Sequence, residues 1–239
     1  MTVMNERGKG GEIPREKAQI ITIDGPVGAG KSAVGKMLAH RLGYRYIDSG
    51  AMYRAVACEA LRRGIALEDE DALSSLIEEA KIEFAEENGR IKIYICKRDV
   101  SEEIRTPGVG QASSRISTLR RVREKLVALQ RQMGIESEIG VIMEGRDIGT
   151  VVFPDADIKF FLESSLEERA RRRHHDLVGI GLDLDFAETL RDVQARDERD
   201  TQRELSPLKP AVDSIRIDST HMDMEEVVEF MLREIKDRL

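Results

Sequence analysis

Residues 25–32 of the chain read Gly25-Pro26-Val27-Gly28-Ala29-Gly30-Lys31-Ser32, a complete GxxxxGK[ST] phosphate-binding loop. An apolar run, 20–23, precedes this loop, and a helix-like segment, 33–39, follows it. The motif requires this context of strand, glycine turn and helix N-terminus, because backbone N–H groups and the positive end of the helix then meet phosphate oxygens. The motif therefore predicts that residues 25–33, ending at Ala33, bind a nucleoside triphosphate. Lys31 is expected to reach the β- and γ-phosphates, and the Ser32 hydroxyl to lie near Mg²⁺.

The composition is that of a highly charged globular protein of 239 residues, 41% hydrophobic and 35% charged. Its 38 Lys and Arg against 45 Asp and Glu leave a formal net charge of −7. This balance argues against a nucleic-acid partner, and it requires basic residues to be clustered where a polyanionic nucleotide binds.

The sequence has no apolar run of the roughly 18 residues that a membrane span needs. Residues 1–17 lack the apolar segment of a signal peptide, so we expect a disordered extension on a cytoplasmic protein. A monomer is expected, because no sustained apolar surface heptad is present.

Helical and strand patterns alternate along the chain, which predicts an α/β fold with a parallel sheet flanked by helices. The final segment carries apolar residues at helical spacing over 227–235 and should pack on the core. The expected strands are 19–24, 44–47, 141–143, 158–162 and 214–217, and the other core helices are 31–42 and 51–63.

Two segments interrupt this alternation. In residues 82–100, alternating isoleucines and an Asn88-Gly89 turn predict a small antiparallel hairpin within an inserted lobe. Residues 167–203 are rich in Arg, Asp and Glu around a glycine-bearing joint at 178–181. Such a helix pair can form a mobile lid over bound phosphates, and a solvated helical hairpin is the alternative.

Cysteine and histidine show no metal or disulfide pattern. Cys58 and Cys96 fit no CxxC or Cys/His spacing, so we expect two free thiols that are buried or half-buried. The sequence His174-His175-Asp176 lies in an arginine-rich run and is expected to belong to a solvated face.

A phosphate-binding loop occurs in GTPases, motor ATPases and kinases alike, so other features must discriminate. An NKxD guanine-binding tetrad is missing from the sequence, and so is a motor-type Walker B strand, for which 141–144 is the nearest candidate. Arginines suit phosphoryl transfer because their planar fork binds phosphate bidentately and stays charged. Candidates stand after the second strand, after the inserted lobe, after a core strand and in the lid segment: Arg54, Arg105, Arg115, Arg123, Arg146, Arg191, Arg196, Arg199 and Arg203.

Several further motifs resemble those of bacterial cytidylate kinases, in the same order and from about residue 19 to the C-terminus. The Asp-Ser-Gly-x-x-Tyr-Arg and Gly-Arg-Asp blocks are far more specific than the phosphate-binding loop. The resemblance is carried by the segments 21–26, 48–54, 103–106, 145–156, 196–200 and 206–208.

The resemblance implies a nucleoside monophosphate kinase with a P-loop core (18–81 and 119–239), an inserted monophosphate-binding lobe (82–118) and a helical lid (167–203). Positions that match the acceptor site of the family are Ser49, Arg54, Ser114, Arg123, Arg146, Asp147, Arg196, Asp200 and Arg203. Lys31, Arg146 and Arg196 are the implied catalytic residues. One departure is Ala33, where the family commonly has a hydroxyl residue.

The chemistry of these side chains fits a cytosine nucleotide. Asp147 or Ser114 can accept from the exocyclic amino group, and Arg123 can donate to the N3 and O2 acceptors. Asp200 can accept from a ribose hydroxyl, and the other arginines can face phosphates. The expected activity is ATP-dependent phosphorylation of CMP and dCMP to the diphosphates, with Mg²⁺. A kinase acting on UMP, AMP or shikimate, and a non-enzymatic nucleotide-dependent switch, remain alternatives.

Overall fold

A computed structural model describes residues 18–87, 89–179, 181 and 185–239 of the chain. The predicted N-terminal extension (1–17), Asn88 of the hairpin turn and part of the lid joint (180 and 182–184) lie outside the described residues.

The core is a five-stranded sheet in the order β2-β6-β1-β7-β8, in which every neighbouring pair is parallel. The strands are β1 (Ile20–Asp24), β2 (Arg45–Asp48), β6 (Val141–Gly145), β7 (Ile158–Glu163) and β8 (Ile215–Asp218). Because β1 is central, all five of its residues are buried. The prediction of a parallel sheet is confirmed.

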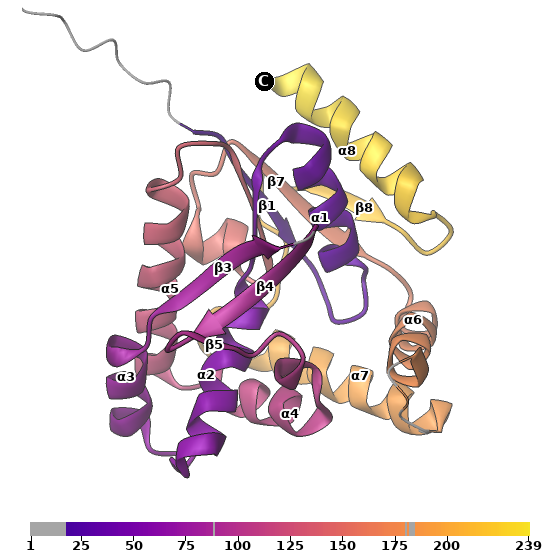
Figure 1. Ribbon diagram of the computed structural model, residues 1–239. Coiled ribbons are helices and arrows are strands. Elements are labelled where there is room, and N and C mark those ends of the chain that lie inside the picture. Colours follow the sequence, from indigo (N-terminus) through magenta and orange to yellow (C-terminus); the bar gives the residue numbers. More distant parts are fainter. Residues whose placement is uncertain (1–17, 88, 180, 182–184) are drawn as a thin grey trace, which may run out of the picture.

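Helices cover both faces of this sheet (Figure 1). The α-helices are α1 (Lys31–Leu42), α2 (Ser49–Arg63), α3 (Glu70–Glu79), α4 (Pro107–Ile116), α5 (Arg120–Ile135), α6 (Leu166–Gly179), α7 (Phe186–Gln202) and α8 (Met224–Arg238). Two shorter turns are η1 (Glu103–Arg105), a 3₁₀ helix, and η2 (Ile148–Val152), a π-helical turn. Successive strand residues point to two apolar clusters on opposite faces of the sheet. Ile20 packs with α2 and α5, whereas Ile21 and Ile23 pack with α1 and α8. The core therefore has three layers, with the sheet between two layers of helices.

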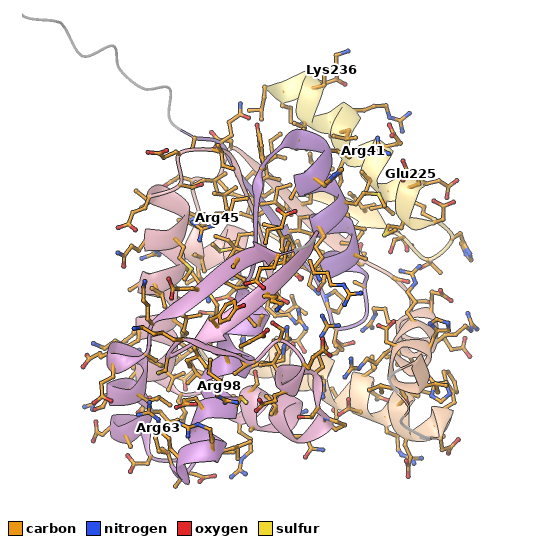
Figure 2. All side chains as sticks on the ribbon, viewed as in Figure 1. Arg41, Arg45, Arg63, Arg98, Glu225 and Lys236 are labelled. Carbon is orange, nitrogen blue, oxygen red and sulfur yellow. The ribbon has the colours of Figure 1, made fainter. Side chains whose placement is uncertain are left out.

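The ends of the helices follow local capping chemistry. The Asp48 carboxylate accepts from Ala51 N at 2.8 Å, so α2 begins at Ser49, two residues earlier than expected for this helix. Asp223 and Glu226 form a reciprocal capping box at the start of α8. On the outer surface, Arg41 of α1 forms ion pairs with Glu225 and Glu229 of α8 (Figure 2).

A second, antiparallel sheet projects in front of the core (Figure 1). It consists of β3 (Ile82–Glu87), β4 (Arg90–Ile95) and β5 (Arg98–Asp99). The predicted small antiparallel sheet is therefore confirmed. Its buried side chains, Ile82, Ile93 and Ile95, belong to the same apolar cluster as α2. This lobe thus shares its core with the main domain.

The cysteine prediction is wrong for one residue. Cys58 is buried in α2, but Cys96 is exposed, because Cys96 and Lys97 adopt φ values of 52° and 65° in the tight turn between β4 and β5. His175 and Asp176 are exposed as expected, whereas His174 is half-buried against the ring of Phe186. Within the described residues, none of the helices has the length and apolar character to cross a membrane.

Candidate active site

The phosphate-binding loop connects β1 to α1 and is shaped by its glycines. Gly28 and Gly30 have φ values of 76° and 90°, a left-handed region that favours glycine. A Cβ on Gly25 would lie 2.0 Å from the backbone oxygen of Leu162, so the loop also needs glycine where it passes β7. The loop therefore takes a path that needs glycine and leads into the N-terminus of α1, where an anion can bind.

Lys31, the first residue of α1, is buried inside this loop. Its ammonium group donates to the Pro26 carbonyl at 2.7 Å. Burial, and next the nearby charge of Arg146, lower the pKa of Lys31 from 10.5 to about 7. Burial thus disfavours the protonated form of Lys31, and the negative charge of bound phosphates would favour it.

Glu144, at the end of β6, is a site residue that the sequence analysis did not include. It is buried and accepts from the hydroxyl groups of Ser32 and, at 2.6 Å, Tyr46. The sequence signal was the acidic residue that ends the candidate Walker B strand. Hydroxyl and carboxylate oxygens are the ligand types that Mg²⁺ prefers, so the pair Ser32–Glu144 fits this ion chemically.

Asp24, the last residue of β1, was also missed. Its carboxylate accepts from Ile148 N at 2.8 Å and Gly149 N at 2.7 Å, the first amides of η2. Burial raises the pKa of Asp24 to about 6. These bonds fix the turn that follows Arg146 and Asp147, and so set the direction of both side chains.

The side chains predicted for the acceptor site meet in a connected set of ion pairs at the carboxyl ends of the strands. Arg123 of α5 donates to the Asp147 carboxylate, and both are buried. Arg203, just beyond α7, lies 3.6 Å from Asp147 and 4.0 Å from Asp200. Asp200 in turn accepts from Arg146 Nε at 2.8 Å. Ligands of open α/β sheets bind at this end of the strands.

The other predicted residues surround this set. Ser49 donates to the Glu144 carbonyl at 2.7 Å, and Ser114 lies half-buried on α4. Arg54 forms an ion pair with Asp48 at 2.9 Å. Arg196 of α7 pairs with Asp192 at 3.0 Å and reaches α4, where its guanidinium lies 3.2 Å from the position of a Cβ on Gly110.

Four of the candidate arginines are exposed and stand outside this set: Arg105, Arg115, Arg191 and Arg199. Arg105 donates to the Ser101 carbonyl, and Arg115 forms an ion pair with Glu68; both arginines are exposed. Tyr53, by contrast, belongs to the site although it was not predicted there: its ring lies 5.8 Å from the Arg123 guanidinium carbon. The Tyr53 hydroxyl is buried and has no hydrogen-bond partner among the described residues.

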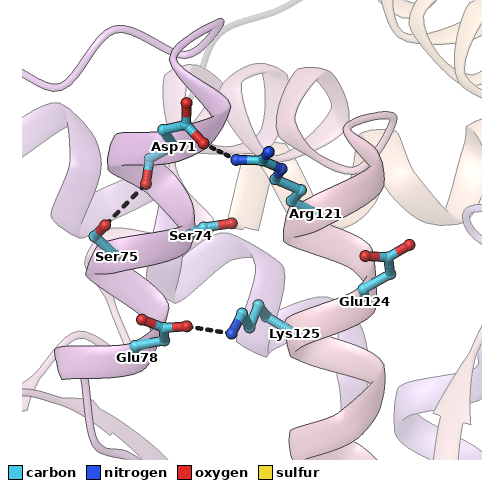
Figure 3. Close-up of a pocket in the computed structure, with 7 residues that line it drawn as sticks. All are labelled: Asp71, Ser74, Ser75, Glu78, Arg121, Glu124 and Lys125. Atoms are coloured by element: carbon cyan, nitrogen blue, oxygen red, sulfur yellow. Dashed lines mark hydrogen bonds and ion pairs between the residues drawn. The ribbon is translucent and has the colours of Figure 1, made fainter.

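A cavity of about 340 Å³ opens beside the phosphate-binding loop. Arg172 of α6 crosses it and donates to the Ser219 carbonyl at 2.7 Å. The cavity is lined by Ala29, Gly30, Ala33, Val34, Leu162, Glu168, Arg172, Ser219, Met222, Asp223, Met224 and Val227. A larger hollow of about 410 Å³ lies between α3 and α5, where the ion pairs Asp71–Arg121 and Glu78–Lys125 bridge it (Figure 3). It contains no residue of the predicted site.

Comparison with known proteins gives three findings. The family model described as cytidylate kinase matches residues 21–237. Cytidylate kinases from Geobacter sp. (strain M21) and Citrifermentans bemidjiense are 49% and 48% identical over 95% and 94% of this chain, covering 97% and 96% of their own lengths. A crystal structure of an uncharacterized protein from Eubacterium ventriosum ATCC 27560 superimposes with a TM-score of 0.51 at 13% identity, covering 92% of this chain and 99% of its own, which supports the fold alone.

Proposed function

The chain belongs to the cytidylate kinase family, and on this premise we propose that its site transfers the γ-phosphoryl group of ATP directly to the phosphate of CMP or dCMP. The observation that carries this assignment is the linked set Arg123–Asp147–Arg203–Asp200–Arg146, which stands next to the phosphate-binding loop. Arg146 is close enough to Lys31 to lower its pKa. The site therefore has a donor side, at the phosphate-binding loop, and an acceptor side, at the linked set of ion pairs. Arg146 lies where the two sides meet.

ATP occupies the donor side. Its phosphates bind the N–H groups of the loop. The nucleoside therefore lies in the neighbouring cavity, which is lined by Ala29 and Gly30 of the loop. The cavity combines apolar walls, among them Met222 and Val227, with the Arg172 guanidinium, whose plane can stack on a base. Ala33 also lines this cavity, where its small side chain leaves space for the nucleotide.

CMP occupies the acceptor side. Asp147 or the Ser114 hydroxyl accepts from the exocyclic amino group of cytosine, and Arg123 donates to the ring acceptors. The partnerless Tyr53 hydroxyl supplies a further buried polar group for the nucleotide. Asp200 accepts from the ribose, whereas Ser49, Arg54, Arg146, Arg196 and Arg203 bind the phosphate side.

In the transfer step the acceptor is already an ionised phosphate oxygen, so no strong general base is needed. Lys31 leaves the Pro26 carbonyl and binds the transferring group, and Arg146 and Arg196 stabilise the charge that spreads over its oxygens. Because Lys31 is buried, its charge acts more strongly than it would in solution.

Ser32, with Glu144 beside it, is the site that fits Mg²⁺. When bound, Mg²⁺ neutralises and aligns the β- and γ-phosphates. The short Ser32–Glu144 contact keeps both oxygen ligands next to the loop.

Other assignments follow from the same proposal. Residues 82–118 act as the monophosphate-binding lobe, and 167–203 act as the lid, since Asp200 of α7 binds Arg146 and Arg196 of α7 reaches Gly110 of α4. The enzyme acts as a cytoplasmic monomer without a nucleic-acid partner, in keeping with its net charge of −7.

An assay of ADP release with CMP, dCMP, UMP and AMP tests the activity. We expect ADP to form with CMP and dCMP and to depend on the acceptor concentration. Preference for UMP or AMP would support one of the alternative kinases. ADP release that ignores the acceptor would support a nucleotide-dependent switch and would overturn the assignment.

A further inference from the structure

Two side chains of the α6–α7 pair hold the backbone of one residue of the phosphate-binding loop, one at its N–H and one at its carbonyl. Arg169 Nη1 donates to the Val27 carbonyl at 3.0 Å, and the Val27 N–H donates to Asp197 Oδ1 at 3.4 Å. Arg169 also donates to Asp197 Oδ2, so the two side chains form an ion pair across the helices. The loop residue Val27 is thus tied to α6 and α7 at once.

The Arg169 side of this contact is buried and closely packed. Arg169 is 7% exposed, and its Nε donates to the Ser164 carbonyl at 2.9 Å. A Cβ on Gly28 would lie 2.7 Å from the backbone oxygen of Arg169. The base of α6 therefore touches the loop, and α6 cannot shift towards it without a clash.

The same turn of α7 carries residues of the acceptor side. Asp197 follows Arg196, which reaches α4 near Gly110. Asp200 lies three residues after Asp197 and binds Arg146. A helix turn moves as a unit because its backbone hydrogen bonds are continuous. A shift of this turn that moves Asp200 relative to Arg146 also changes the contact between Asp197 and Val27.

We propose that Arg169 and Asp197 are positioning residues that couple the two substrate sites. Nucleotide phosphates that bind the loop fix the backbone at Val27. Because Val27 contacts Asp197, the turn of α7 that carries Arg196 and Asp200 is fixed with it. Binding of ATP then lowers the ordering cost of binding CMP, and linkage requires the reverse effect to be equal. This inference rests on the proposed function, because it needs a donor and an acceptor in the two sites.

Equilibrium binding of CMP, measured with and without a saturating non-hydrolysable ATP analogue, tests the coupling in the full chain. The variants are Asp197→Asn, which keeps an acceptor for Val27 but removes the charge, and Asp197→Ala, which removes both. Glu198→Gln is the matched control, since Glu198 is exposed and contacts Gln194 on its own helix at 3.1 Å. Thermal unfolding reports whether each variant folds.

We expect the ATP analogue to strengthen CMP binding roughly fivefold or more in the unmodified enzyme and in Glu198→Gln. The ratio of CMP affinity with the analogue to CMP affinity without it should fall towards one in Asp197→Ala and be intermediate in Asp197→Asn. A merely structural pair would lower the unfolding temperature and leave the ratio unchanged, which would overturn the inference; so would a ratio of one in the unmodified enzyme. Should Asp197→Ala not fold, Asp197→Asn and Arg169→Lys carry the same test. Absence of CMP binding in the unmodified enzyme would instead refute the proposed function.

Discussion

Replacement of Asp147 by alanine should affect both the fold and the acceptor site. Asp147 is 6% exposed and is the carboxylate partner of Arg123, which is 4% exposed. Without it, the partners that Arg123 keeps among the described residues are the Ser117 carbonyl, at 3.1 Å, and the ring of Tyr53. Arg203 loses a carboxylate at 3.6 Å. The variant therefore leaves a buried cation without its compensating charge.

The expected cost is large. Removal of one partner from a buried ion pair destabilises a protein by about 3–5 kcal/mol. In a chain of this length each kcal/mol lowers the unfolding temperature by about 2–4 °C, so a decrease of about 6–20 °C is expected. Loss of the hydrogen bond to cytosine should weaken CMP by about 1.5–3 kcal/mol, which is roughly ten- to a hundredfold. The KM for ATP should change little, because Asp147 lies on the acceptor side.

Urea unfolding and steady-state kinetics in both substrates measure these effects, with the exposed Asp237→Ala of α8 as the control. A double-mutant cycle adds the sharper test. Arg123→Met in the Asp147→Ala background should recover part of the lost stability, because it removes the uncompensated charge. The reasoning is refuted if the two substitutions are additive in stability, or if ATP and CMP are weakened equally.

Three further predictions concern the donor loop, the lid and the metal site. Lys31→Met should lower turnover by about 10²–10³-fold without lowering stability. Between pH 7 and 10.5 the Lys31 side chain binds a proton in the unfolded chain but not in the folded protein, so the unfolding free energy of the unmodified protein should rise with pH over this range. Urea unfolding at several pH values should show this rise in the unmodified protein and not in the variant. Asp200→Ala should raise the KM for CMP more than for dCMP if its partner is the 2′-hydroxyl, whereas Arg196→Ala should lower turnover with both; kinetics like those of the unmodified enzyme in both variants would favour the solvated-hairpin alternative. Glu144→Gln should raise the Mg²⁺ concentration needed for half-maximal rate, measured by Mg²⁺ titration, and an unchanged requirement would exclude Glu144 from the metal site.

The local pattern of the sequence determined the elements and their class. The phosphate-binding loop, the strand before it and the helix after it, the inserted antiparallel sheet and the amphipathic α8 all have signals within about 20 residues of sequence, because turn chemistry and hydrophobic periodicity act over short distances. The positions of the arginines made several of them candidates for the site, but the acceptor-site set, including Asp147 and Asp200, came only from the resemblance to a family, since spacing alone does not bring Arg123 to Asp147.

Only the tertiary structure decided which buried polar groups meet. Ser32 and Glu144 are 112 residues apart in the chain, and Val27 and Asp197 are 170 apart. Asp24 looked like an ordinary strand end until the fold brought two amides of η2 to its carboxylate. The turn between β4 and β5 likewise turned Cys96 outward, against its expected burial. A buried polar side chain must find its partner wherever the packing of distant segments places one, and neither composition nor periodicity encodes that location.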